Sequence, residues 1–275
     1  MVRVPILITN NDNRVYARTK NMKIKCGSQL YTYRNVIKTE EDLRKVFDRL
    51  NDYGCTVAQW SGVRVDISKD ALKEIVKESG ISIPLSHTPW KKITEDTDRV
   101  AEWHAEIGAH TVGLGMMKGE YLKSLDKLNV FCDKANEIGE KLKSYGLSFG
   151  YHNHSMEFKK MGDKLVIEHL RDNCPNLQFI FDTFWCKYAG HDPSEWILKL
   201  GDRVRDIHLK DWKPSILKLP RFQDVGKGEL DFESILKNAE RAGTESALIE
   251  HDTTRNPDKT TKESMEYLKE IYLNK

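Results

Sequence analysis

The feature that most constrains the fold is a repeated alternation of short apolar runs and longer charged segments after residue 22. The runs are rich in β-branched, aromatic and small residues, and their lengths are typical of buried strands. Each run is followed by a segment whose apolar residues recur at helical spacing. The predicted strands cover residues 23–30, 55–61, 81–86, 110–115, 147–153, 177–182, 204–209 and 246–251.

Several of the predicted helices carry signals for where they begin and end. Thr39 and Asp42 have the spacing of a capping box, and Gly54 follows the same helix as a stop. Asp192 followed by Pro193 predicts an N-cap and a first helical residue. These signals indicate that the charged segments are helices and predict where those helices begin or end.

Eight strand–helix units in this order predict an α/β fold, a single (β/α)8 TIM barrel over residues 22–275. The alternative is an open, doubly wound sheet, which has fewer units and a Gly-rich turn after its first strand. The segment CGSQLYTYR follows the first predicted strand here, and no fitting GxGxxG or P-loop motif occurs. Residues 1–21 are expected to form an N-terminal leader, disordered and outside the domain.

Composition narrows the classes of partner. The formal net charge is only +2 and no long basic run occurs, which argues against nucleic acid as the ligand. No apolar stretch is long enough to span a membrane. The five cysteines are widely spaced, odd in number and without a CxxC pair, which predicts free thiols in the cytoplasm. Apolar positions on the outer helices permit a homo-oligomer without requiring one.

Polar side chains with affinity for metals stand at the ends of the last four predicted strands. In a barrel of parallel strands these ends meet at one rim, where active sites lie. Carboxylates and imidazoles there are costly unless they are paired or bind a cation. A mixed set of this kind suits one divalent metal ion, Mn²⁺, Mg²⁺, Co²⁺ or Zn²⁺. The residues at these ends include His152, His154, Glu157, Asp182, His208, Lys210 and Glu250.

Five segments together resemble a known family. YHNHSMEF, FDTFWCKYAGHDP, VRDIHLKDW, FQDVGKGELDFESIL and ALIEHD occur in this order. They look like the sugar phosphate isomerase/epimerase family of xylose isomerase-like TIM barrels, which includes inosose dehydratases, ketose 3-epimerases and, more distantly, endonuclease IV. The resemblance covers nearly all of residues 23–273.

The resemblance implies a single divalent metal held by Glu157, Asp182, His208 and Glu250. It also implies that Glu157 and Glu250 exchange a proton with the substrate carbon. The strand-five residue is the open position, because many relatives carry their Glu at the strand end, where this chain has His152. His152 would serve equally as the base, and His152 or His154 could reach the metal or the substrate. A cation on a ketone acidifies the neighbouring C–H and stabilises the enediolate that forms.

Other residues near the expected rim are candidates for contacts with a carbohydrate substrate. Lys210 lies two residues after His208 and therefore on the same face of the strand. Trp185 and Trp212 could stack on the apolar faces of a sugar. His87 and His154 complete the predicted substrate-binding set. A solvent-facing Lys210, rim-packing tryptophans and a capping role for His87 are the structural alternatives.

Four functions remain to be weighed on this scaffold. The first is a metal-dependent isomerase or epimerase of a sugar, sugar phosphate or keto-sugar. The second is a lyase of the inosose dehydratase kind, in which the same enediolate expels water. DNA repair of the endonuclease IV kind fits poorly, because Trp185 and Gly226 occupy positions where those enzymes place histidines. The fourth is a non-catalytic sugar-binding barrel.

Overall fold

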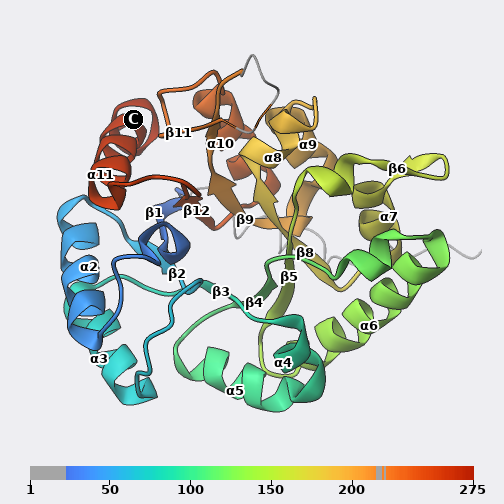
Figure 1. Ribbon diagram of the computed structural model, residues 1–275, viewed down its shortest axis with the longest axis horizontal. Helices are drawn as coiled ribbons and strands as arrows, with labels where there is room; N and C mark the ends of the chain where they lie inside the picture. Colours follow the sequence, from blue (N-terminus) through green and yellow to red (C-terminus); the bar gives the residue numbers. More distant parts are fainter. Residues whose placement is uncertain (1–22, 215–218, 220) are drawn as a thin grey trace, which may run out of the picture.

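Eight parallel strands form the centre of the molecule, with helices around them (Figure 1). The structure is a computed structural model, and it describes residues 23–214, 219 and 221–275; the predicted leader, residues 1–21, lies outside these. Neighbours in the sheet follow the order β2-β1-β12-β9-β8-β5-β4-β3. The strands are β1 (Lys25–Gln29), β2 (Val57–Gln59), β3 (Leu85–His87), β4 (Thr111–Leu114), β5 (Ser148–His152), β8 (Leu177–Asp182), β9 (Val204–Leu209) and β12 (Ser246–Ile249).

The two ends of this sheet meet between β2 and β3. Isolated parallel bridges join Val57 to Ser82 and Trp60 to Ser86 on either side of Pro84, which has no N–H to donate. Every other neighbouring pair shares a ladder of three or four residue pairs. The chain therefore folds as the predicted (β/α)8 TIM barrel, with its least regular contact at the seam between β2 and β3.

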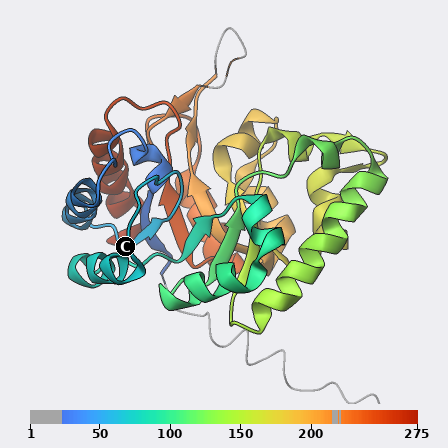
Figure 2. The ribbon, with the colours of Figure 1, turned by 60° about the horizontal axis from the view of Figure 1, so that its bottom comes forward.

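Helices cover the outside of the barrel, and the long α6 runs along the side away from α2 and α3 (Figures 1 and 2). Short two-stranded hairpins, β6 (Lys160–Met161) with β7 (Lys164–Leu165) and β10 (Asp211–Trp212) with β11 (Phe222–Gln223), extend the loops after β5 and β9. The α-helices are α2 (Glu40–Asp52), α3 (Lys69–Ser79), α4 (Trp90–Glu95), α5 (Thr97–Glu106), α6 (Leu125–Lys143), α7 (Val166–Asn173), α8 (Thr183–Tyr188), α9 (Pro193–Leu200), α10 (Phe232–Ala242) and α11 (Pro257–Leu268). Short helical turns are η1 (Leu30–Tyr33), η2 (Gly119–Leu122), η3 (Ser155–Phe158), η4 (Gly201–Arg203) and η5 (Lys269–Leu273).

The helix boundaries confirm the capping signals. Thr39 and Asp42 form the reciprocal capping box at the start of α2, and Gly54, with φ of 86°, follows its end. Asp192 accepts backbone N–H groups at the start of α9, where Pro193 is the first helical residue. No helix in the part of the chain that the structure describes could cross a membrane. All five cysteines are free and buried.

The interior of the barrel is filled in layers. Val57, Leu85, Ile180 and Leu248 form a compact apolar plug in the middle. Glycines on neighbouring strands make room for it: a Cβ on Gly113 would lie 2.7 Å from Ile180 Cδ1. Because side chains alternate along a strand, residues two positions beyond the plug also point inward, at the carboxyl ends. The plug therefore lies directly beneath the inward-pointing residues at the carboxyl ends of the strands.

Candidate metal and substrate site

Four polar side chains meet above the apolar plug, at the carboxyl ends of four adjacent strands. His152, Asp182, His208 and Glu250 each offer one ligand atom, and these atoms all lie within 4.8 Å of one another. They come from β5, β8, β9 and the residue after β12. All four are buried. Three of them are residues that the sequence predicts as metal ligands, and His152 is the fourth.

Hydrogen bonds turn a lone pair of each histidine toward a carboxylate. His208 Nε2 lies 2.5 Å from Gln59 Oε1, which can only accept, so the proton belongs on Nε2 and Nδ1 keeps its lone pair. His152 Nδ1 likewise donates to the Gly115 carbonyl at 3.1 Å. The free nitrogens then face Glu250 Oε2 at 2.8 Å and Asp182 Oδ2 at 3.1 Å.

A histidine nitrogen and a carboxylate oxygen at such distances repel each other unless a proton or a metal cation lies between them. His208 Nδ1 is a buried atom without a hydrogen-bond donor among the described residues. Mixed nitrogen and oxygen donors with fixed second-shell partners suit a divalent metal ion. The donor set therefore fits one divalent cation, whose identity it leaves open.

Lys210 places an ammonium group at the edge of the same cluster. Its Nζ lies 3.2 Å from Asp182 Oδ2, 3.2 Å from Glu250 Oε2 and 3.0 Å from Asp252 Oδ1. Burial alone would lower the pKa of Lys210, but the three carboxylates raise it above its usual value. Burial raises the pKa of Asp182 and Glu250, yet the net effect of Lys210 and the histidines is to hold both below their usual range. The lysine therefore stays charged, and it is not solvent-facing.

Aromatic rings border the cluster on two sides. The His87 ring lies 5.2 Å from that of His152 and 5.5 Å from that of His208. The His154 ring lies 4.7 Å from His152 and 5.4 Å from Trp185. Burial is the main cause that lowers the pKa of His87, and it lowers that of His154 to about 3, so both are neutral near pH 7. Together with Lys210, four of the five side chains predicted to contact the substrate therefore lie beside the cluster.

Glu157 takes a different position from the one implied by the resemblance. Its Oε1 accepts the Tyr151 hydroxyl at 2.6 Å, and its Oε2 accepts the backbone N–H of His154 at 2.7 Å. It is buried and lies outside the four-residue group. The reason is local: β5 ends at His152, and the chain then turns into η3, where the Glu157 side chain caps that turn.

Trp212 also lies apart from the cluster. It belongs to β10, pairs with Phe222, and its ring faces Lys187 Nζ at 5.7 Å. Phe222 instead comes near the site, with Lys210 Nζ 5.9 Å from its ring and Trp185 5.8 Å away. The aromatic wall beside Lys210 is therefore Trp185 with Phe222.

The glycine-containing loop after β11 folds around a carboxylate of the protein itself. Asp211 accepts the backbone N–H groups of Trp212, Gly226, Gly228 and Leu230 at 2.7 to 3.2 Å. A Cβ on Gly228 would lie 2.3 Å from Asp211 Oδ1. These amides are the donors that a phosphate would need. The loop therefore serves as an internal anchor and leaves no cradle for a phosphate.

Sequence reasoning assigned no role to Gln59 or Asp252, although both stand at strand ends. Gln59 fixes the tautomer of His208, and Asp252 holds Lys210. Burial and the nearby Glu250 raise the pKa of Asp252 to about 6. The sequence signal for both is a polar residue at the end of a predicted strand, which in a closed barrel lies near the residues at the other strand ends.

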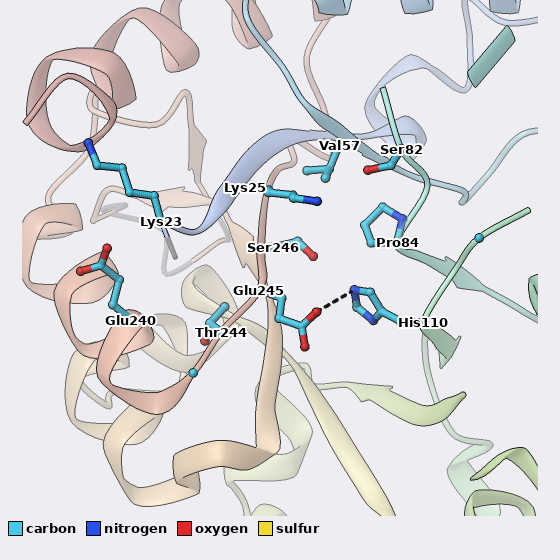
Figure 3. Close-up of a pocket in the computed structure, with 12 residues that line it drawn as sticks. Lys23, Lys25, Val57, Ser82, Pro84, His110, Glu240, Thr244, Glu245 and Ser246 are labelled. Atoms are coloured by element: carbon cyan, nitrogen blue, oxygen red, sulfur yellow. Dashed lines mark ion pairs between the residues drawn. The ribbon is translucent and has the colours of Figure 1, made fainter. Parts of the chain in front are cut away.

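A second hollow, of about 390 Å³, lies at the opposite end of the barrel (Figure 3). Its charged groups face one another: His110 Nε2 is 3.7 Å from Glu245 Oε2 and 3.8 Å from Asp206 Oδ1. Asp206 is also bound by Ser246 and Thr111 hydroxyls. The amino ends of barrel strands contribute stability rather than catalysis, and this mutual pairing is typical of that role.

Comparisons with solved structures agree with the barrel fold. A solved structure of a sugar phosphate isomerase/epimerase from Parabacteroides distasonis has a TM-score of 0.76 and 23% identity, covering 93% of this chain and 97% of that one. L-ribulose 3-epimerase has a TM-score of 0.71 at 12% identity, covering 92% of this chain and 95% of that one. At such identities the likeness shows the fold alone.

Curated relatives match this chain over shorter stretches. Inosose dehydratase of Clostridium botulinum is 29% identical over 137 residues, 43% of this chain and 45% of that protein. Inosose dehydratase of Clostridium beijerinckii is 23% identical over 171 residues, 56% of this chain and 57% of that protein. The match thus spans about half the length of these relatives.

The family model described as "Xylose isomerase-like TIM barrel" matches residues 47–271, most of the chain and all the residues of the metal cluster. The barrel, the rim that carries the cluster and this match lead to one conclusion. The chain belongs to the xylose isomerase-like TIM barrel family.

Proposed function

We propose that this protein is a divalent-metal-dependent isomerase or epimerase of a keto-sugar or related sugar that moves a proton on the carbon next to the carbonyl. The observation that carries the proposal is the set of histidine lone pairs facing carboxylates in the His152, Asp182, His208 and Glu250 cluster. When bound there, a Mn²⁺, Mg²⁺, Co²⁺ or Zn²⁺ ion supplies a Lewis acid for the substrate oxygens.

Glu250 is the base in this proposal. Its pKa lies well below the usual range, so the carboxylate is ionised at neutral pH and able to accept a proton. The Lys210 ammonium, 3.2 Å from Glu250 Oε2, donates a hydrogen bond to a substrate oxygen as negative charge develops there. Trp185 and Phe222 offer apolar faces for the C–H side of the sugar.

His152 takes the place that the resemblance gave to Glu157, as a neutral ligand that Gly115 orients. Glu157 positions the turn after β5 through its contacts with Tyr151 and the His154 backbone. The site then has one carboxylate base and one ammonium acid, in place of two glutamate bases.

This arrangement also favours a second candidate, a lyase of the inosose dehydratase kind. An ammonium group is an acid that protonates a departing hydroxyl, so that a hydroxyl next to the deprotonated carbon leaves as water. The curated inosose dehydratases among the relatives support this candidate. The five free, buried cysteines support a reducing location, and we place the protein in the cytoplasm.

Solvent deuterium exchange tests the proposal. The metal-loaded protein is incubated in D₂O with ketoses, their phosphates, inosose and 3-keto-glycosides, and C–H signals are followed by NMR. We expect one C–H signal of the substrate to be lost when the metal is bound. The signal should persist without the metal and with the Glu250→Gln variant. Glu245→Gln, at the opposite end of the barrel, is the matched control and should exchange normally.

The product decides between the two candidates. A rearranged sugar of the same composition, apart from incorporated deuterium, supports an isomerase or epimerase, whereas a product that has lost one water supports the lyase. Metal bound in stoichiometric amount without exchange on any member of the panel would refute proton abstraction from these substrates. Sugar binding without exchange would then support the non-catalytic barrel.

A further inference from the structure

A hollow of about 630 Å³ lies beside the metal cluster, at the carboxyl ends of β2 and β3. It extends to α4 and α5, which cover this sector of the barrel (Figure 1). Its lining includes Trp60, Ser61, Val63, His87, Arg99 and Trp103. A hollow of this size at the catalytic rim is large enough to hold a ring of the substrate.

The hollow and the cluster share one residue, His87, which lines the hollow and contacts the cluster. One side of the His87 ring faces His152 and His208, and the same residue lines the hollow. His87 Nδ1 contacts Ser61 Oγ at 3.3 Å, and Ser61 lines the hollow as well. A ring at the cluster and a ring in the hollow would therefore lie on the two sides of His87, at the ends of β2 and β3.

Two tryptophans form the far wall. The Trp60 and Trp103 rings lie 6.2 Å apart with their planes at 53°, so they make an open corner. Both are half-buried, and neither indole N–H bonds to another described residue. Indole faces pack well against the C–H faces of a sugar ring, and free N–H groups meet its hydroxyls. Behind them, His104 is fully bonded to Ser86 and the Val100 carbonyl.

The charges at the mouth argue for a neutral ligand. Lys92 and Arg99 line the hollow together with Glu95 and Asp96, so two positive charges balance two negative ones. A phosphate group would need uncompensated positive charge or a nest of backbone amides. Mixed donors and acceptors around aromatic faces suit hydroxyl groups instead.

From these observations we propose that the hollow is a second sugar subsite, so that the substrate is a glycoside or oligosaccharide with a ring beyond the one that reacts. The proposal rests on the proposed function, because the first ring is placed at the metal cluster. Trp103 is the specificity-determining residue, since it contacts the second ring and no reacting atom. A single-ring sugar leaves this corner empty.

Calorimetric titration of the Mn²⁺-loaded full chain tests the subsite without requiring turnover. D-fructose is compared with turanose, leucrose and isomaltulose, which are the same ketose carrying a glucosyl ring at three different oxygens. We expect at least one of the three to bind about tenfold more tightly than fructose, the gain that ring stacking typically provides. Trp103→Leu should remove this gain and leave the affinity for fructose unchanged.

Two further variants guard against a folding defect. Val63→Trp fills the hollow from its half-buried edge and should also abolish the gain. Tyr121 is an aromatic residue that lines a different hollow, so Tyr121→Leu should keep the gain in affinity for the two-ring sugars. Equal affinity for fructose and all three glucosyl derivatives, including no measurable heat from any, would overturn the subsite.

The two proposals fail in different ways. Tighter binding of a two-ring sugar without deuterium exchange would reject the enzymatic function and keep the subsite. Exchange on fructose with no gain from a second ring would keep the function and reject the subsite.

Discussion

Replacement of Lys210 by methionine tests the electrostatic reading of the site most directly. The substitution keeps the length of the side chain but removes an ammonium that lies 3.0 to 3.2 Å from three carboxylates. At these distances each pair is worth about 5 kcal/mol with an effective dielectric constant of about 20, most of which offsets the cost of burying the charges. Because the carboxylates stay buried without their partner, we expect the metal-free variant to lose about 3–5 kcal/mol of unfolding free energy.

A divalent cation should reverse much of this loss. It brings positive charge to the same Asp182 and Glu250 oxygens, so metal binding should stabilise Lys210→Met more than the wild type. Urea unfolding followed by tryptophan fluorescence, in EDTA and in Mn²⁺, measures both effects. Lys199→Met, at a half-exposed position 3.8 Å from Glu195, is the control and should change stability by less than about 0.5 kcal/mol. A metal-free Lys210→Met protein within about 1 kcal/mol of the wild type would refute the reasoning.

Three other predictions follow from residues around the site. Glu157→Gln should still bind one metal ion by elemental analysis, whereas Asp182→Asn should not; loss of metal in both would return Glu157 to the ligand set. Gly228→Ala should lower the melting temperature, because its Cβ would lie 2.3 Å from the carboxylate that anchors the loop, whereas Gly119→Ala meets open space and should not. Burial lowers the pKa of His104 to about 4 from 6.5, so protonation favours the unfolded state. About 3 kcal/mol of stability present above pH 6.5 should therefore be lost as the pH falls to 4, and in urea titrations of His104→Gln the loss of stability over this range should be smaller by that amount.

The fold could be predicted because its signals are local. Strand runs, helical stripes and caps such as Thr39 and Asp192 each act within a few residues, and eight repeats of one unit leave few topologies. The rim position of Asp182, His208 and Glu250 follows from strand direction alone. These three meet in the structure as expected.

The fourth ligand could not be chosen from sequence, because it depends on where β5 ends. The segment YHNHSMEF offers His152, His154 and Glu157, and a turn of a few residues decides which one points into the barrel. The pairing of Gln59 with His208 was equally hidden, since these residues are 149 positions apart and meet only across the closed barrel. Long-range contacts of this kind carry no local pattern.

The irregular seam between β2 and β3 lies on the side of the barrel opposite the candidate ligands. The four candidate ligands stand at the carboxyl ends of β5, β8, β9 and β12, which are joined by ladders of four residue pairs. The seam, with its two isolated bridges, carries Trp60 and borders the Ser61 loop. Backbone hydrogen bonds cross the seam on both sides of Pro84, and the ladder is interrupted at that residue. Changes at this interruption would therefore alter the surroundings of Trp60 and Ser61, while the four candidate ligands on the opposite wall of the barrel keep their positions.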